Sequence, residues 1–185
     1  LGSGTNSAVL ALTVFDDGSG PALHAGGVFT SAGGVAASRI AKWDGSSWSA
    51  LGSGTGDVFA LTVYDDGSGP ALYAGGSFVS AGGVAASRIA KWDGSSWSTL
   101  GSGMGPSSGS AHALAVHDDG SGPALYAGGS FGSAGGVSAL SIAGQCLLYV
   151  FGSGAGDRLY PAVTRGPEAR RRLARQIADF SLAGI

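Results

Sequence analysis

Apolar and polar positions alternate in short runs along the first fifty residues. In residues 9–15, large and β-branched side chains recur at every second position, so Leu10, Leu12 and Val14 lie on one face of an extended chain. Further runs of this kind follow, separated by Gly, Ser and Asp. The pattern predicts four short strands, at residues 9–15, 22–25, 38–43 and 47–51.

Turn residues separate the predicted strands. Asp-Gly pairs at 17–18 and 44–45 supply the positive-φ positions that tight hairpin turns need. A Gly-Gly doublet at 26–27 ends the second strand, where it allows a β-bulge or a close approach of another backbone. The segment therefore indicates an all-β unit.

The same unit returns 49 residues later. Residues 23–27 (LHAGG) recur at 72–76 (LYAGG), and the eleven residues from Arg39 recur unchanged from Arg88. A third copy begins at Leu100 and loses the match after Val137. A period near 50 residues is typical of a four-stranded propeller blade. We divide the chain into blade-like repeat 1 (1–50), blade-like repeat 2 (51–99), a degenerate repeat 3 (100–143) and a divergent tail (144–185).

The tail has a different character. Leu173, Ile177 and Phe180 lie at helical spacing after Pro167, which predicts a short helix at about 167–180. Residues 1–150 carry a net charge of −5 and residues 151–185 carry +3, so the whole chain carries −2. This small overall charge gives no indication of a nucleic-acid partner.

Three features carry a resemblance to a known repeat: a Gly-Gly doublet after the second strand, an aromatic-Asp turn after the third, and a Trp on the fourth. This pattern resembles the kelch-like repeats of the galactose oxidase-type β-propeller superfamily. It is closer still to repeats of fungal cell-cortex landmark proteins of the Rax2 type and of large secreted proteins of bacteria such as planctomycetes. The resemblance implies an all-β fold of kelch-like four-stranded units, as a partial β-propeller or an open blade array, and an extracellular or cell-surface location. The structural positions of the repeat are then Gly26, Gly27, Trp48, Gly75, Gly76, Trp97, Gly128 and Gly129.

The sequence offers no convincing catalytic or metal site. The Asp pair at 16–17 suits a hairpin turn better than a calcium loop, because adjacent side chains diverge in an extended chain. His24 occupies the position of Tyr73, and we interpret it as a ring-for-ring replacement. His112 and His117 are five residues apart, so they face opposite sides of one strand. We expect no catalytic residue, no cofactor and no metal.

Four side chains form a possible ligand surface. Trp43 and Trp92 precede Asp-Gly turns, and Arg39 and Arg88 begin the same strands. Blade packing for the tryptophans and a solvated strand edge for the arginines remain open alternatives. We interpret the chain as a non-enzymatic module for protein or glycan interaction. The alternative is part of a carbohydrate-active or oxidase-like propeller enzyme whose catalytic residues lie outside this chain.

The remaining features concern disulfides, membrane spans and the extent of the chain. A single cysteine, Cys146, excludes an internal disulfide, and no apolar run is long enough for a transmembrane helix. The chain opens inside a repeat, without an initiator Met or a signal-peptide pattern, so we expect a fragment of a larger protein. Further blades or self-association would then cover its exposed edges.

Overall fold

The computed structural model describes residues 3–105, 109–118, 123–131, 133–134, 137–138, 141–142 and 146–151. All regular secondary structure in these residues is β-strand, which confirms the prediction of an all-β chain. The helix expected at 167–180 lies outside the described residues. In the part of the chain that the structure describes, no helix is long and apolar enough to span a membrane.

Sheet 1 is an antiparallel meander formed by the first fifty residues, with strand order β1-β2-β5-β6. A two-stranded hairpin, β3–β4, connects β2 to β5. The third predicted strand starts later than expected because Arg39 has a φ of 64°, which interrupts the extended chain before β5. The bounds are β1 Val9–Asp16, β2 Pro21–Gly27, β3 Ser31–Ala32, β4 Val35–Ala36, β5 Ile40–Trp43 and β6 Trp48–Ala50.

Sheet 2 has the matching order β7-β8-β10-β11, and β9 pairs with the far end of β8. Here β8 runs without a break through the segment that forms β2 and β3 in sheet 1. The bounds are β7 Thr55–Asp65, β8 Pro70–Ala81, β9 Val84–Ala85, β10 Ile89–Trp92 and β11 Trp97–Thr99.

Sheet 3 has the order β12-β13-β17-β16, and β14–β15 form a separate hairpin. Its third strand differs from those of sheets 1 and 2. Gly75 pairs with Ile89 in sheet 2, whereas Gly128 pairs with Leu148 in sheet 3, so β17 takes the place that the repeat alignment assigns to Ile142. The Lys-Trp-Asp-Gly segment is missing after Ile142, and the next apolar run is paired instead. The bounds are β12 Ser110–Asp118, β13 Pro123–Ser130, β14 Ser133–Ala134, β15 Val137–Ser138, β16 Ser141–Ile142 and β17 Cys146–Phe151.

Each sheet has two faces, which we name from the register of sheet 1. Leu12 pairs with Ala25, and Leu23 pairs with Trp43, so these side chains share one face, called face A. The opposite face, called face B, carries Phe15, His24, Gly26 and Ile40.

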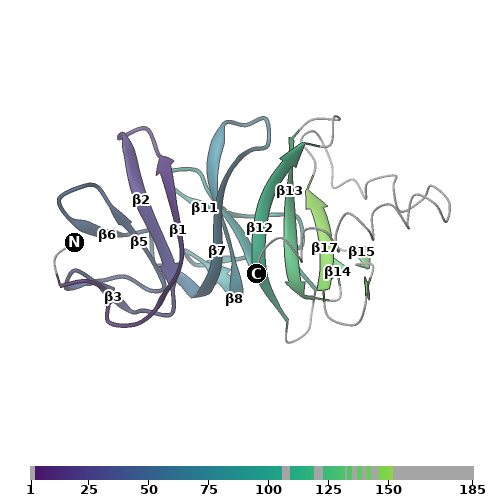
Figure 1. The fold of residues 1–185 in the computed structure, drawn as a ribbon, viewed down its shortest axis with the longest axis horizontal. Coiled ribbons are helices and arrows are strands. Elements are labelled where there is room, and N and C mark those ends of the chain that lie inside the picture. Colours follow the sequence, from purple (N-terminus) through teal and green to yellow (C-terminus); the bar gives the residue numbers. More distant parts are fainter. Residues whose placement is uncertain are drawn as a thin grey trace.

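The three sheets lie in a row, with face B of one sheet against face A of the next (Figure 1). One core cluster joins Phe15 and Ile40 of sheet 1 to Leu72 and Trp92 of sheet 2. A second cluster joins face B of sheet 2, including Tyr73, to face A of sheet 3. The described residues form no closed ring or barrel, so the propeller remains a hypothesis.

The two glycines of each doublet have different structural roles. A Cβ on Gly26 would collide with Val58 of sheet 2, and a Cβ on Gly75 would lie 3.2 Å from Ala111 of sheet 3. The first glycine therefore lets the next sheet approach closely. A Cβ on the second glycine, as at Gly27, would collide with the paired strand of its own sheet, where the register shifts at a bulge.

Candidate functional site

The four residues of the predicted ligand surface do not form one site. Trp43 ends β5 and Arg39 directly precedes it, and Trp92 and Arg88 hold the same places around β10. The aromatic and the cationic side chains therefore lie at opposite ends of a strand.

The arginines act differently although both have left-handed backbone, with φ values of 64° and 65°. Arg39 Nε lies 3.2 Å from Asp57 Oδ1, in a pair that is one-third exposed or more. Arg88 instead donates from Nε to the Gly109 carbonyl oxygen at 2.6 Å, and from Nη1 to those of Met104 and Gly105 at 2.9 and 2.8 Å. Arg88 thus holds the chain segment that enters sheet 3.

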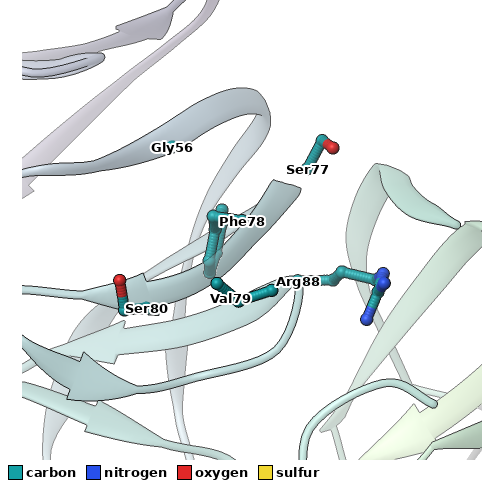
Figure 2. Close-up of a pocket in the computed structure, with 6 residues that line it drawn as sticks. All are labelled: Gly56, Ser77, Phe78, Val79, Ser80 and Arg88. Carbon is teal, nitrogen blue, oxygen red and sulfur yellow. The ribbon is translucent and has the colours of Figure 1, made fainter. Parts of the chain in front are cut away.

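A shallow pocket of about 280 Å³ lies beside Arg88 (Figure 2). In repeat 1 the side chain of Asn6 fills the equivalent space. Its Oδ1 accepts hydrogen bonds from the amides of Thr30 and Ser31, the counterparts of Val79 and Ser80, at 2.8 and 3.0 Å. Repeat 2 has a shorter loop with Gly56 there, so the space lacks that side chain. Among the described residues, no acid, histidine or cysteine lines the pocket; its lining residues are Gly56, Ser77, Phe78, Val79, Ser80 and Arg88.

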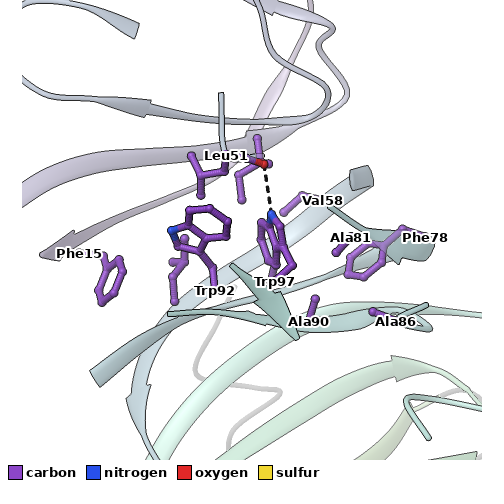
Figure 3. Close-up of a cluster of buried hydrophobic side chains, with 12 residues drawn as sticks. Phe15, Leu51, Val58, Phe78, Ala81, Ala86, Ala90, Trp92 and Trp97 are labelled. Atoms are coloured by element: carbon purple, nitrogen blue, oxygen red, sulfur yellow. Dashed lines mark hydrogen bonds between the residues drawn. The ribbon is translucent and has the colours of Figure 1, made fainter. Parts of the chain in front are cut away.

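The tryptophans of the predicted surface have different surroundings. Trp92 is 8% exposed and belongs to the cluster that contains Phe15 and Leu51 (Figure 3). Its partner Trp97 donates from Nε1 to the Leu51 carbonyl oxygen at 3.1 Å. Trp43 packs against Trp48 at a ring-centroid distance of 5.5 Å, much like the Trp92–Trp97 pair at 5.3 Å, but it remains half-buried. Only Trp43 of the two predicted surface tryptophans therefore faces solvent.

Trp43 belongs to an exposed apolar surface on face A of sheet 1. Leu12 and Val14, which pair with Ala25 and Leu23 on this face, are 59% and 61% exposed, and Leu23 is half-buried. On sheet 2 the counterpart of Leu23 is Leu72, which is fully buried against sheet 1. An exposed apolar surface of this kind is a candidate interaction site.

Face B carries an ion pair beside the first turn of each intact repeat. Lys42 Nζ lies 2.5 Å from Asp17 Oδ2 and 2.7 Å from Ser19 Oγ, and the hydrogen bonds from Lys42 and Ser19 lower the pKa of Asp17 to about 2. Lys91 and Asp66 repeat the pair at 2.7 Å. There the Tyr73 hydroxyl also donates to Asp66 at 3.0 Å.

His24 stands where Tyr73 stands in repeat 2, and it is fully buried. Its Nδ1 lies 3.2 Å from the Ala22 carbonyl oxygen, whereas Nε2 has no hydrogen-bond partner among the described residues. Burial lowers the pKa of His24, so the ring is neutral in the folded protein. A neutral, enclosed ring packed against Phe15 at 5.6 Å suits a core position.

The Asp pair at 16–17 binds its own turn. Asp16 Oδ1 accepts hydrogen bonds from the amides of Gly18 and Gly20, both at 2.9 Å, and Asp17 Oδ1 accepts one from the amide of Ser19 at 3.1 Å. Within the described ranges, no three His, Cys, Asp or Glu side chains gather in a geometry that could hold a metal ion.

Sequence reasoning missed the exposed face A of sheet 1 as a site. It placed Leu10, Leu12 and Val14 on one side of a strand but did not ask which sheet would cover that side. The available signal was the apolar match of Leu12 and Val14 with Leu61 and Val63, which pack against sheet 1 in repeat 2. Leu10 lies at the bulge of β1, and its counterpart Phe59 instead stacks on His112 of sheet 3. Neighbouring units of a repeat cover one another's apolar faces, so the first unit has a face that no preceding sheet of the chain covers.

No protein-family model, curated protein or solved structure matches the chain. The geometry of the described residues therefore carries the functional inference.

Proposed function

We propose that this chain is a non-enzymatic interaction module of kelch-like repeat units, acting at the cell surface or outside the cell, and that face A of sheet 1 binds a protein. The observation that supports this is the exposure of Leu12 and Val14 on a face whose counterparts in sheet 2, Leu61 and Val63, pack against sheet 1. Covering apolar surface contributes about 25 cal/mol per Å² to association. A protein partner gains most of its binding free energy from such a surface.

A protein ligand fits this surface better than a glycan does. A glycan that stacks on an aromatic ring also needs polar groups nearby to fix its orientation. Trp43 is bordered on its sheet by Leu23 and Trp48, both apolar, and Arg39 lies at the other end of β5. The carboxylate of Asp44, which follows Trp43, already accepts hydrogen bonds from Ser46 and Ser47 of its own turn.

The enzyme alternative receives no support from the described residues. In the part of the chain that the structure describes, no side chain lining the pocket beside Arg88 could act as a general acid or base. Its arginine already donates to three backbone carbonyl oxygens.

The test is a photo-crosslinking amino acid at position 12, in the centre of face A. The matched control carries the same amino acid at position 79, where Val79 is 70% exposed but lies beside the pocket. Both variants are irradiated with the cell-surface and secreted proteins of the source organism. We expect protein crosslinks from position 12 that are absent from position 79.

A glycan array provides the opposing test. Binding of the chain to glycans, lost in Trp43→Ala and accompanied by no crosslink from position 12, would show that the surface recognises carbohydrate instead of protein.

A further inference from the structure

Face A of sheet 1 has two counterparts within the chain, and both are covered in the same way. Face A of sheet 2 lies against face B of sheet 1, and face A of sheet 3 lies against face B of sheet 2. In each case the covering face belongs to the preceding sheet of the row (Figure 1). The molecule itself therefore shows which kind of surface fits over Leu12 and Val14.

The fit depends on a glycine in the covering face. Val58 and Leu61 of sheet 2 lie against Gly26, with Leu61 3.3 Å from the place of a Cβ on that glycine. Ala111 and Leu114 of sheet 3 lie against Gly75, at 3.2 and 3.3 Å from the corresponding place. A suitable cover for face A of sheet 1 is thus a face B with a glycine in its second strand.

The other end of the row carries such a face. Face B of sheet 3 contains Gly128 at the position of Gly26 and Gly75, and Tyr126 at the position of Tyr73. Gly26 and Gly75 are buried, whereas Gly128 is half-buried. Among the described residues, a Cβ on Gly128 would meet only Ala113 of its own sheet, at 3.8 Å.

We infer that face A of sheet 1 is covered by face B of sheet 3 from a second copy of this chain. The inference rests on the proposed function, because it names the protein that the surface binds. The contact is heterologous, so successive copies join head to tail and continue the row of sheets. Such assembly ends either in a closed ring or in an open filament.

Sedimentation analysis of the purified chain tests this inference. We expect an average mass that rises with concentration in the micromolar to millimolar range. Leu12→Glu on face A and Gly128→Val on face B each weaken association by about 10- to 100-fold, because each removes well-packed apolar contact at the joint. Val79→Glu, an equally exposed site away from both faces, leaves association unchanged.

Mixing the two interface variants identifies the geometry. Leu12→Glu retains an intact face B and Gly128→Val an intact face A, so the head-to-tail arrangement predicts that a mixture forms dimers and stops there. Circular dichroism checks that each variant is folded. If Gly128→Val does not fold, Gly128→Ala replaces it, and its single methyl group weakens association less.

Two results overturn the inference. If Gly128→Val still forms dimers while Leu12→Glu is monomeric, face A pairs with itself; the head-to-tail geometry is then wrong although the surface still binds protein. If the unmodified chain stays monomeric throughout the concentration range, a second copy is not the partner. The crosslinks from position 12 to other proteins then decide the proposed function separately.

Discussion

Repeats 1 and 2 have the same eleven residues from Arg39 to Ser49 and from Arg88 to Ser98, yet the two segments have different environments. Trp92 is 8% exposed because sheet 1 covers it, whereas the identical Trp43 is half-buried at the end of the row. The local geometry is the same, as the two Trp–Trp contacts show. Trp48 and Trp97 are 8% and 6% exposed, because Trp48 packs against Phe29 and Ala32 of its own repeat. The burial of the first tryptophan therefore depends on the neighbouring sheet, whereas the repeat itself buries the second.

The largest expected effect comes from the tryptophans. Trp92→Ala should lower the free energy of unfolding by about 3–5 kcal/mol, because a large buried side chain leaves a cavity between two sheets. Trp43→Ala should lower it by only about 1 kcal/mol, because solvent already reaches the ring. Urea denaturation of dilute protein measures both values. Equal losses would mean that face A of sheet 1 is covered even in the isolated chain.

The glycines of the sheet interfaces provide the next comparison. Gly26→Val should destabilise the chain by about 2–3 kcal/mol, because the added side chain collides with Val58 and overpacks the interface. Gly128→Val is the matched control and should cost less than about 1 kcal/mol in dilute solution. A large cost at Gly128 would show that face B of sheet 3 is already packed in the isolated chain.

The two arginines should differ although they share a backbone conformation. Arg88→Gly should cost about 2 kcal/mol even after relief of the left-handed strain, because three carbonyl oxygens lose a charged donor. Arg39→Gly should be close to neutral, because relief of about 1 kcal/mol of left-handed strain offsets the loss of an exposed ion pair. Thermal unfolding of the two variants at equal ionic strength measures the difference. A larger loss of stability at Arg39 would refute the view that Arg88 holds the segment that enters sheet 3.

The smallest expected effect concerns His24 and its counterpart Tyr73. His24→Tyr should stabilise the chain by about 1 kcal/mol, because the new hydroxyl can donate to Asp17 as Tyr73 does to Asp66. The reverse change, Tyr73→His, should destabilise it.

His24→Tyr should also change how the stability of the chain depends on pH. Burial lowers the pKa of His24 below its ordinary 6.5, so below that pH the unfolded chain binds a proton that the folded chain does not. Stability contributed by the neutral ring is present above pH 6.5 and declines as the pH falls. Denaturation at about pH 7.5 and about pH 5 should show a loss in the unmodified chain that is smaller in His24→Tyr. An equal loss in both proteins would show that another group is responsible.

Much of each unit was predictable from local pattern. Alternation placed Leu12 and Val14 on one face of β1, and the Asp-Gly turn after β1 is held by hydrogen bonds to Asp16 and Asp17. The third strand of sheet 3 was less predictable. Strand β17, which lies in the tail, pairs with β13 in place of the segment around Ile142, so sheet 3 extends beyond residue 143. Register in a decaying repeat depends on which apolar run is available to pair.

The amino-acid sequence by itself determined the all-β class, the turns and the glycine doublets, because alternation and positive-φ requirements act over a few neighbouring residues. Only the tertiary structure decided which apolar faces are covered. Trp43 and Trp92 cannot be distinguished by their neighbours in sequence, and they differ because one sheet has a preceding sheet in the row and the other does not. Removal of apolar surface from water depends on what lies across the interface, and that information is not local.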